Sequence, residues 1–327
     1  MRLLRAAGFL IGLCLACVPA SAETWPSRVI TLVVPFGAGS GTDIIARIVA
    51  AKASEIIGKQ IIVEDIGGGG GTIAVSRVAR ADPDGYHFII GAVDTFAQAQ
   101  YLFENPPSNT MTDFEPIALA VEQPLVFVAR KELPVNNLTE FAAYLKSHQN
   151  EMKFGSAGVG AAPYLACAMI NKAVGATAIH VPYRAAAPAL QDMLAGDIDY
   201  YCPLAVSAIP FVKNSSIKLL AVLTPTRSPI FPDLPTAREQ GIDVTDGYYW
   251  NGFFAPKGTP TEIINKLSAA ISTALDDPTV QERLREFAAT VVPADRRSPD
   301  YLKSYLGEEI KKWSVIMKDN GVVRQVR

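Results

Sequence analysis

The sequence predicts an α/β protein with parallel β-sheets in two domains, and three observations lead to this prediction. Short apolar runs rich in β-branched residues alternate with helical patterns through most of the chain. Gly-rich segments separate several of these runs from the helices that follow them. The 327 residues, 49% of them hydrophobic and 19% charged, are enough for two well-filled cores and argue against disorder. Strands joined through helices form parallel sheets with right-handed crossovers.

The N-terminal part of the chain follows a β-α-β-α-β pattern. The segment 29–34 is a continuous apolar run, which is typical of a strand buried on both faces. Gly58 stands where a helix is expected to end. We predict strands at 29–34, 60–64 and 87–91, and helices at 42–57 and 72–80.

The middle of the chain repeats this pattern, and the C-terminal third is helical. In the middle we predict strands at 125–129, 152–155, 178–181, 198–202 and 217–222. The helices there are expected at 139–148, capped by Thr139, after the loop 156–163 up to Ala173, and at 185–194. The proline-rich segment 226–235 is expected to be a loop, and the last helices span 261–275, 278–289 and 298–317.

The N-terminus has the layout of a secretory signal peptide. Arg2 and Arg5 precede an apolar run at 6–18, and the segment 19–22 carries small residues at the cleavage positions. We predict that residues 1–22 are removed by a cut after Ala22 and that the remaining chain is exported to the periplasm. The apolar run is shorter than the roughly 20 residues of a membrane span; an uncleaved anchor is the alternative.

The four cysteines divide between the signal peptide and the mature chain. Cys14 and Cys17 belong to the signal peptide, and a lipid anchor on Cys17 would need Leu where Cys14 stands. Cys167 and Cys202 remain, an even number in an oxidising compartment, and they predict a disulfide. Two buried free thiols are the alternative.

The charge of the chain excludes bulk attraction to nucleic acid. The formal net charge is −2, and loss of the two arginines of the signal peptide makes it more negative. No basic cluster suggests a local exception.

The segment 36–43 is the most informative motif, because it follows a buried strand and opens a helix. Helix N-termini carry unpaired N–H groups and a partial positive charge, and glycine lets a ligand approach the backbone. The segment therefore predicts a site for a carboxylate or a phosphate. Its candidate ligand-binding residues are Phe36, Ala38, Gly39, Ser40, Gly41, Thr42 and Asp43. We interpret the carboxylate of Asp43 as a brace of the loop, since it would repel an anion.

A second glycine loop, at 155–164, follows the same logic in the other half of the chain. Its candidate residues are Ser156, Gly158, Gly160, Ala162 and Tyr164. Two such loops that face each other across a cleft could hold the two ends of an acid. The alternative for each loop is an ordinary turn without a ligand. The glycine run 67–71 also precedes a helix and is a weaker candidate.

Four further candidates come from strands and from their ends. Asp94 and Thr95 follow the strand 87–91, and Tyr201 lies in the strand 198–202. Trp250 belongs to the dense aromatic run 248–254, which could floor a cleft or pack in a core.

Catalytic and metal-binding patterns are poor. The three histidines, His87, His148 and His180, lie outside zinc-ligand spacings, and no G-x-S-x-G motif occurs. We therefore predict neither catalytic residues nor a metal, and no cofactor. The alternative class is an exported dehydrogenase, because Gly37-x-Gly39 follows a strand and Glu64 and Asp65 end the next one. Against it, Thr42 occupies the position of the third glycine.

Several segments together resemble one family of receptors. In order along the chain they are 25–28 (Trp-Pro-Ser-Arg), 34–43, 82–86, 180–184 (His-Val-Pro-Tyr-Arg), 187–190, 233–236 and 254–260. In this combination and order the chain resembles the Bug-type solute receptors of tripartite tricarboxylate transporters, over essentially the whole mature sequence.

The resemblance implies a type II periplasmic-binding fold with two α/β lobes and a ligand cleft between them. We place lobe 1 at 23–124 plus 248–327 and lobe 2 at 125–247. The resemblance further implies that both glycine loops hold a ligand carboxylate, largely through backbone amides and bound water. Ligands of the family are di- and tricarboxylates, acidic amino acids, nicotinate and aromatic acids. The partners it implies are integral-membrane transporter subunits, and we expect a monomer that closes around its ligand.

Two positions depart from the family pattern. The family often has His where Tyr164 stands and an acidic residue near Pro203, both facing the cleft, so that the resemblance implies a less polar distal pocket here. Cys167 and Cys202 lie in these same two segments, which favours their pairing.

Overall fold

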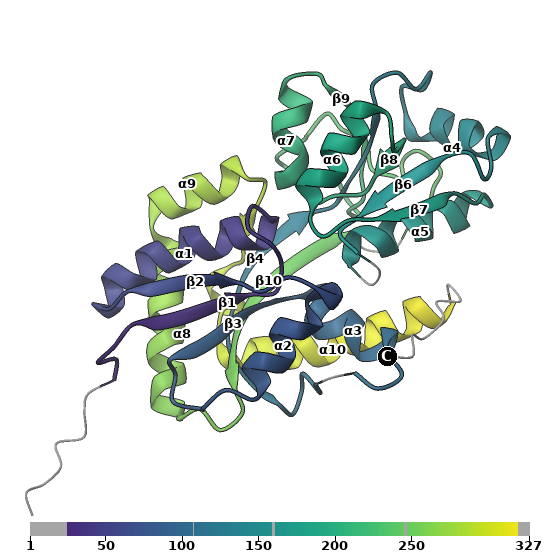
Figure 1. Ribbon diagram of the computed structural model, residues 1–327. Helices are drawn as coiled ribbons and strands as arrows, with labels where there is room; N and C mark the ends of the chain where they lie inside the picture. The colour runs from purple at the N-terminus through teal and green to yellow at the C-terminus, as the bar shows by residue number, and fades with distance from the viewer. Residues whose placement is uncertain (1–24, 107, 159–160, 245–246, 320–327) are drawn as a thin grey trace, which may run out of the picture.

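The computed structural model describes residues 25–106, 108–158, 161–244 and 247–319. The predicted signal peptide with its cleavage site lies outside these residues, as does the candidate Gly160. Two β-sheets, each covered by helices, form two lobes (Figure 1). The predicted α/β architecture is confirmed, although both sheets contain antiparallel as well as parallel pairs.

The lobes are defined here by their sheets, of order β11-β4-β10-β3-β1-β2 in lobe 1 and β7-β6-β8-β5-β9 in lobe 2. The strands of lobe 1 are β1 (Ile30–Val34), β2 (Ile61–Asp65), β3 (His87–Ala92), β4 (Phe114–Pro124), β10 (Tyr248–Pro256) and β11 (Thr290–Val291). Those of lobe 2 are β5 (Val126–Arg130), β6 (Lys153–Ser156), β7 (Ile179–Pro182), β8 (Tyr200–Tyr201) and β9 (Ile217–Val222).

The helices divide in the same way. Lobe 1 carries α1 (Gly41–Ile57), α2 (Thr72–Ala79), α3 (Ala99–Leu102), α8 (Thr261–Asp276), α9 (Pro278–Glu286) and α10 (Pro299–Asp319), with a π-helical turn at Val93–Gln98 and short 3₁₀ turns at Gly69–Gly71 and Ala294–Arg296. Lobe 2 carries α4 (Leu138–Ser147), α5 (Ala162–Val174), α6 (Ala186–Ala195) and α7 (Ala205–Lys213). Among the described residues, no helix is both long enough and apolar enough to cross a membrane.

The sheet of lobe 1 is buried on both faces, as the apolar sequence of β1 predicts. Leu32 packs in a core with side chains of α1 and α8, whereas the next residue, Val33, packs on the other face with side chains of α2 and α10. Successive residues of a strand point to opposite faces. Because both faces are covered by helices, every position of β1 selects an apolar or half-buried residue.

Lobe 2 shows the same alternation in β5. Phe127 packs with Phe141 of α4, with ring centroids 4.6 Å apart, and belongs to the same core as Ile170 of α5. Val126 and Val128 face the other side of the sheet, where α6 and α7 lie. The core on this side of β5 therefore packs against α6 and α7, two helices that contribute residues to the candidate site described below.

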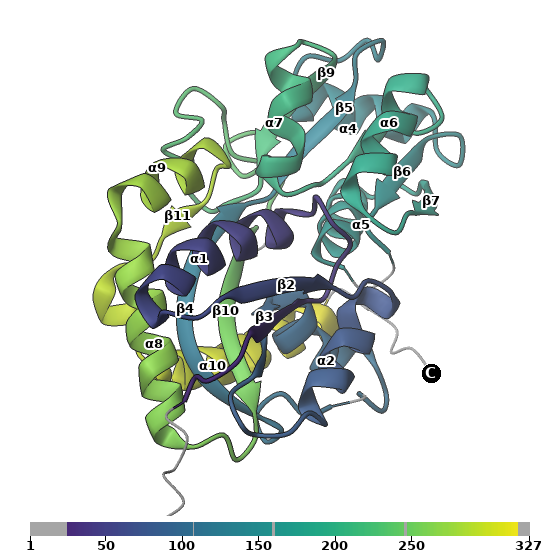
Figure 2. The ribbon, with the colours of Figure 1, turned by 60° about the vertical axis from the view of Figure 1, so that its left-hand side comes forward.

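Two long strands connect the lobes. β4 and β10 pair antiparallel from Tyr248↔Pro124 to Pro256↔Phe114 and lie side by side in the centre of lobe 1 (Figure 2). Each continues directly toward lobe 2, where the backbone N–H of Leu125 donates to the carbonyl of Gly247 at 2.9 Å and that of Gly247 donates to Leu223 at 3.0 Å. A Cβ at Gly247 would lie 2.4 Å from the carbonyl oxygen of Leu223, so this junction requires glycine.

The predicted disulfide is present. Cys167 of α5 and Cys202, which directly follows β8, are bonded with their Cα atoms 5.6 Å apart. The bond closes a loop with a sequence separation of 35 and joins a helix of lobe 2 to its central strand.

Most predicted elements form with small shifts of their ends, but one cap differs and the structure contains further elements that the sequence pattern did not indicate. The helix at 139–148 is capped by Asn137, which accepts a hydrogen bond from the N–H of Glu140 at 2.8 Å, rather than by Thr139. Helix α7 and strand β4 were not expected, since Pro210 lies inside the helix and Pro116 and Pro124 lie in the strand. Proline disfavours both the interior of a helix and the interior of a strand, because it lacks the backbone N–H that each structure uses.

Candidate functional site

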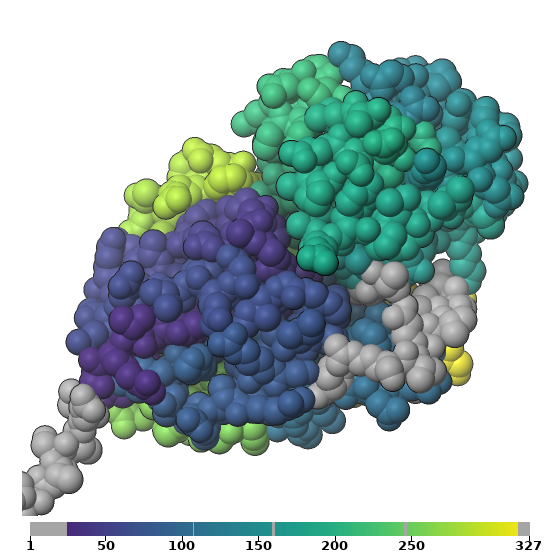
Figure 3. Space-filling view, viewed as in Figure 1, coloured from purple at the N-terminus to yellow at the C-terminus, as the bar shows by residue number. Residues whose placement is uncertain are grey.

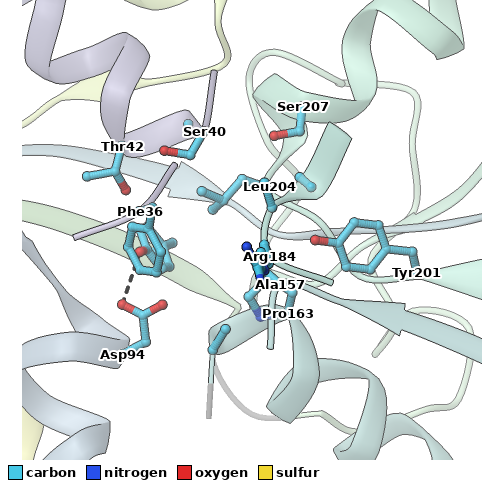
Figure 4. Close-up of a pocket in the computed structure, with 15 residues that line it drawn as sticks. Phe36, Ser40, Thr42, Asp94, Ala157, Pro163, Arg184, Tyr201, Leu204 and Ser207 are labelled. Atoms are coloured by element: carbon cyan, nitrogen blue, oxygen red, sulfur yellow. Dashed lines mark hydrogen bonds between the residues drawn. The ribbon is translucent and has the colours of Figure 1, made fainter. Parts of the chain in front are cut away.

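A pocket with a cavity volume of about 40 Å³ lies between the lobes (Figure 4), which meet along the boundary seen in Figure 3. Lobe 1 lines it with Phe36, Ser40, Gly41, Thr42, Asp94 and Tyr249. Lobe 2 lines it with Ala157, Ala161, Pro163, Arg184, Ala185, Ala186, Tyr201, Leu204 and Ser207. Most of these side chains are apolar. Among the described residues that line the pocket, Arg184 is the only cation and Asp94 the only acid.

The N-terminal turn of α1 forms one side of the pocket. Ser40 caps the helix, because its hydroxyl accepts a hydrogen bond from the N–H of Asp43 at 3.2 Å. Gly41 and Thr42 are the first two residues of α1. The first N–H groups of a helix have no partner inside it and carry the positive end of its dipole. This turn therefore presents donors and partial positive charge to the pocket.

Asp43 stabilises the loop, as its sequence position suggests. Its carboxylate accepts a hydrogen bond from the N–H of Gly39 at 2.8 Å and pairs with Arg47 of α1 at 2.6 Å. Arg47 also pairs with Asp65 at the end of β2, at 2.6 Å. The charge of Asp43 is thus balanced by Arg47, which also pairs with Asp65 of β2, and Asp43 does not line the pocket.

A buried polar network includes three residues that line the pocket, Thr42, Asp94 and Tyr249. The hydroxyl of Tyr249 on β10 donates to Asp94 at 3.0 Å (the interaction drawn as a dashed line at Asp94 in Figure 4). Nearby, the side-chain amide of Gln123 on β4 donates to Asn251, whose amide in turn donates to the hydroxyl of Thr42 at 3.4 Å. The two connecting strands thus reach the first turn of α1 through a chain of amides.

Asp94 is 2% exposed, and its carboxylate accepts three hydrogen bonds. Besides Tyr249, its donors are the backbone N–H of Thr95 at 2.8 Å and the backbone N–H of Ala162 at 3.4 Å. Burial is the largest influence and raises the pKa of Asp94 to about 6. Ala162 is the first residue of α5, so that an acid of lobe 1 occupies the N-terminus of a helix of lobe 2.

The second glycine loop contributes neighbours of its predicted residues. The hydroxyl of Ser156 is 2.6 Å from Nε2 of His180 and accepts the N–H of Gly158 at 3.0 Å, so it is engaged inside lobe 2. Burial lowers the pKa of His180, which favours the neutral form of the ring. Ala157, Ala161 and Pro163, which flank the predicted positions, line the pocket instead.

Six of the sixteen sequence candidates meet at the pocket: Phe36, Ser40, Gly41, Thr42, Asp94 and Tyr201. Eight others lie elsewhere in the described chain: Ala38, Gly39, Asp43, Thr95, Ser156, Ala162, Tyr164 and Trp250. Gly158 lines an adjoining cavity together with the glycines 68–71, Phe36 and Arg184.

Some of these candidates have visible structural roles. The hydroxyl of Thr95 closes its own turn by pairing with the backbone of Ala92. Tyr164 lies against His180, with ring centroids 4.6 Å apart. Trp250 points to the other side of β10, where its indole N–H donates to Glu309 of α10 at 2.9 Å.

Sequence reasoning missed Arg184, Ser207, Leu204 and Tyr249 as site residues. Arg184 lies just beyond the end of β7, in a sequence motif noted above, and loops beyond the carboxyl ends of strands commonly bear ligands. Tyr249 belongs to the aromatic run 248–254 and directly precedes Trp250, the residue predicted from that run. Ser207 lies on the unexpected helix α7 and has no such signal.

The described residues contain no cluster of three or more His, Cys, Asp or Glu side chains that could hold a metal ion. Glu64 and Asp65, which would bind a ribose in a dinucleotide site, form ion pairs with Arg77 at 2.7 Å and Arg47 at 2.6 Å. The pocket itself combines one cation, Arg184, with the N-terminus of α1.

The model of the tripartite tricarboxylate transporter family receptor, TctC, matches residues 45–322. This chain belongs to that family. Among solved structures, the periplasmic binding protein BugD is 36% identical with a TM-score of 0.88, covering 92% of this chain and 100% of BugD. MatC of Rhodopseudomonas palustris, solved with bound malate, is 38% identical with a TM-score of 0.85, covering 89% of this chain and 99% of its own.

A third TctC-like structure, Rpa4515 of R. palustris with adipate, is 30% identical with a TM-score of 0.87 and covers 92% of this chain and 100% of its own. The predicted resemblance to Bug-type receptors is thereby confirmed, and so is the fold of a periplasmic binding protein. The disulfide of this TctC receptor fits the oxidising periplasm in which such proteins work.

Proposed function

We propose that this TctC receptor captures a small organic carboxylate in the pocket between its lobes and delivers it to integral-membrane transporter subunits. The lobes are proposed to span 23–124 plus 248–327 and 125–247, after removal of a signal peptide at 1–22. The ligand class is a di- or tricarboxylate, or an aromatic acid. The receptor acts as a monomer in the periplasm and needs no cofactor.

One observation carries the proposal: the N-terminal turn of α1 and the guanidinium of Arg184 line the same pocket from opposite lobes. Both attract an anion, the first through backbone N–H groups and the helix dipole and the second through a full charge. The apolar walls suit the carbon skeleton of a small acid. MatC and Rpa4515 were solved with malate and adipate, which supports the dicarboxylate class.

A ligand that contacts both lobes is expected to draw them together. A ligand that touches both lobes binds the closed arrangement better than an open one and must shift the population toward closure. The junction at Leu125, Leu223 and Gly247 is the natural hinge, because both chain crossings meet there. Closure gives the transporter a way to distinguish loaded from empty receptor.

Calorimetry with malate, succinate, adipate, citrate and benzoate tests this function. We expect micromolar dissociation constants, about −8 kcal/mol, for at least one of these acids. Small-angle scattering is expected to show a smaller radius of gyration at saturation. Failure of every acid to bind would overturn the assignment, and an unchanged radius with a bound acid would overturn closure alone.

The alternative of an exported dehydrogenase predicts that a dinucleotide binds and that the acid is converted. We expect neither. Nuclear magnetic resonance of malate incubated with the receptor and NAD is expected to show an unchanged spectrum, and appearance of an oxidised product would favour the enzyme. The proposed export is checked by N-terminal sequencing, which is expected to begin at Glu23; a lipid-modified Cys17 would contradict it.

A further inference from the structure

We infer that the hydroxyl of Tyr201 selects a ligand that carries, besides its carboxylate, an uncharged oxygen group such as a hydroxyl or a keto group. This inference rests on the proposed function and adds a specific chemical requirement to it.

Tyr201 is a buried polar group that the protein itself leaves without a partner. It lies on β8, its residue is fully buried, and its hydroxyl has no hydrogen-bond partner among the described residues. It also lines the pocket, and in Figure 4 its hydroxyl points toward the middle of that pocket, facing the lobe 1 residues across it. Buried tyrosine hydroxyls usually find a partner, because an unmade bond leaves their desolvation uncompensated.

Other tyrosines of this protein follow that rule. The hydroxyl of Tyr200, the neighbouring residue on β8, donates to Asn171 at 2.7 Å. Tyr249 donates to Asp94 at 3.0 Å, and Tyr183 donates to Asp192 at 2.6 Å. The unpartnered hydroxyl of Tyr201 is therefore a local exception, and it occurs where a ligand is expected to sit.

The surroundings of Tyr201 determine which ligand group suits it. Its side chain belongs to an apolar cluster with Val126, Val128, Leu190 and Ile198. Burial raises the pKa of Tyr201 far above the physiological range, so its hydroxyl stays neutral and can donate or accept. An ionised group at this position would be taken out of water beside a neutral partner, which is unfavourable.

The carboxylate of the ligand is better matched by Arg184 and the first turn of α1 than by Tyr201. Arg184 lines the same pocket but is exposed at its mouth, and the first turn of α1 lies on the lobe 1 side. A carboxylate is matched there, whereas a hydroxyl or keto oxygen on the chain is matched by Tyr201. Sites built to bond a polar substituent reject the analogue that lacks it, because their own buried group is then left unpaired.

The test compares acids that differ by one oxygen group: malate with succinate, and 2-oxoglutarate with glutarate. By calorimetry we expect wild-type receptor to bind at least one oxygenated acid about tenfold more tightly than its plain partner. Tyr201→Phe is expected to bring this ratio close to one. Without ligand, Tyr201→Phe is expected to melt at the wild-type temperature or above, because the lost hydroxyl had no partner.

Tyr200→Phe is the matched control on the neighbouring residue. It removes a hydroxyl that is bonded to Asn171, so it is expected to lower the melting temperature and to leave the affinity ratio unchanged. A ratio that is preserved in Tyr201→Phe, while wild type binds the acids, would overturn this inference and leave the proposed function intact. Absence of binding of all four acids to wild type would overturn this inference, whereas the proposed function would fall only if adipate, citrate and benzoate also failed to bind.

Discussion

The carboxylate of Asp94 in lobe 1 accepts a hydrogen bond from the backbone N–H of Ala162 in lobe 2, at 3.4 Å. The acid thereby caps the first turn of α5, the turn that sequence reasoning had assigned to the ligand. A helix N-terminus that a protein carboxylate already occupies has less to offer an anion from solution. In the proposed binding mode, the ligand carboxylate therefore depends more on α1 and Arg184 than on the second glycine loop.

Replacement of Asp94 by Asn is expected to change how stability depends on pH. Burial raises the pKa of Asp94 to about 6, above its ordinary value of 3.8. Between pH 4 and 6 the folded protein therefore holds this proton more tightly than the unfolded chain, and the free energy of unfolding falls as pH rises through that range. The loss amounts to about 3 kcal/mol, at 1.4 kcal/mol per pKa unit.

Urea denaturation at several pH values measures this effect. Asp94→Asn has no proton to lose, so its stability relative to wild type is expected to increase from pH 4 to pH 7. Parallel curves for the two proteins would contradict the assignment. His180 is present in both proteins, so its contribution cancels in the comparison.

Substitution of Gly41 tests the contact between α1 and lobe 2. A Cβ at Gly41 would lie 2.7 Å from Cγ1 of Val206 and 2.9 Å from Cδ1 of Leu204, both at the start of α7. Gly41→Ala is therefore expected to hinder closure and to weaken acid binding about tenfold or more, about 1.4 kcal/mol. Calorimetry and small-angle scattering at saturation measure the two consequences.

Gly37→Ala, in the same loop, is the matched control. Its Cβ would meet only the Cβ of Ala185, at 4.0 Å, which is an ordinary contact. Its affinity and its scattering are expected to remain at the wild-type level. Equal affinities of the two variants would show that closeness of α1 to α7 does not govern binding.

Removal of the Arg184 guanidinium is expected to weaken binding of dicarboxylates. Hydrogen bonds to charged groups contribute about 1.5–3 kcal/mol, so Arg184→Ala should lose about ten- to a hundredfold in affinity. Arg184→Lys keeps the charge but lacks the planar guanidinium, so its affinity is expected to lie between those of wild type and Arg184→Ala. Arg238→Ala, which removes an exposed partner of Asp243 away from the pocket, serves as the control. Full affinity of Arg184→Ala for every acid would exclude this role.

The disulfide is expected to contribute strongly to stability. A bond that closes a loop with a separation of 35 residues stabilises by about 3–4 kcal/mol, if restriction of the unfolded chain is the dominant effect. Urea midpoints of the double variant Cys167→Ala/Cys202→Ala report this loss. Reductant is expected to destabilise wild type to a similar extent and to leave the stability of the double variant unchanged. If reductant did not change the stability of wild type, this would contradict a disulfide between Cys167 and Cys202.

The first glycine loop could be predicted from sequence because its structure is local. The order strand, glycines, helix places the N–H groups of Gly41 and Thr42 at a helix start whatever the rest of the chain does. The disulfide could also be predicted, because only two cysteines follow the predicted signal peptide and the periplasm is oxidising.

The remaining wall of the site depends on tertiary contacts that a sequence does not display. Tyr249 and Asp94 are 155 residues apart and meet only through the pairing of β10 with β3. In the aromatic run, adjacent residues face opposite sides of β10, and a pattern aromatic at nearly every position does not indicate which side faces the ligand. Here the predicted residue Trp250 faces α10, whereas its neighbour Tyr249 lines the pocket.

The position of β10 has a consequence for the order in which the exported chain acquires its structure. β10 lies between β3 and β4 in the sheet of lobe 1, yet it follows the whole of lobe 2 in sequence. Until residues 248–256 emerge from the translocation pore, β3 and β4 have unpaired edges and the centre of their sheet is absent. The chain of lobe 2, its two cysteines included, is complete before that moment, so the second lobe is the part that can fold and oxidise first, and the N-terminal lobe must wait for the last quarter of the protein.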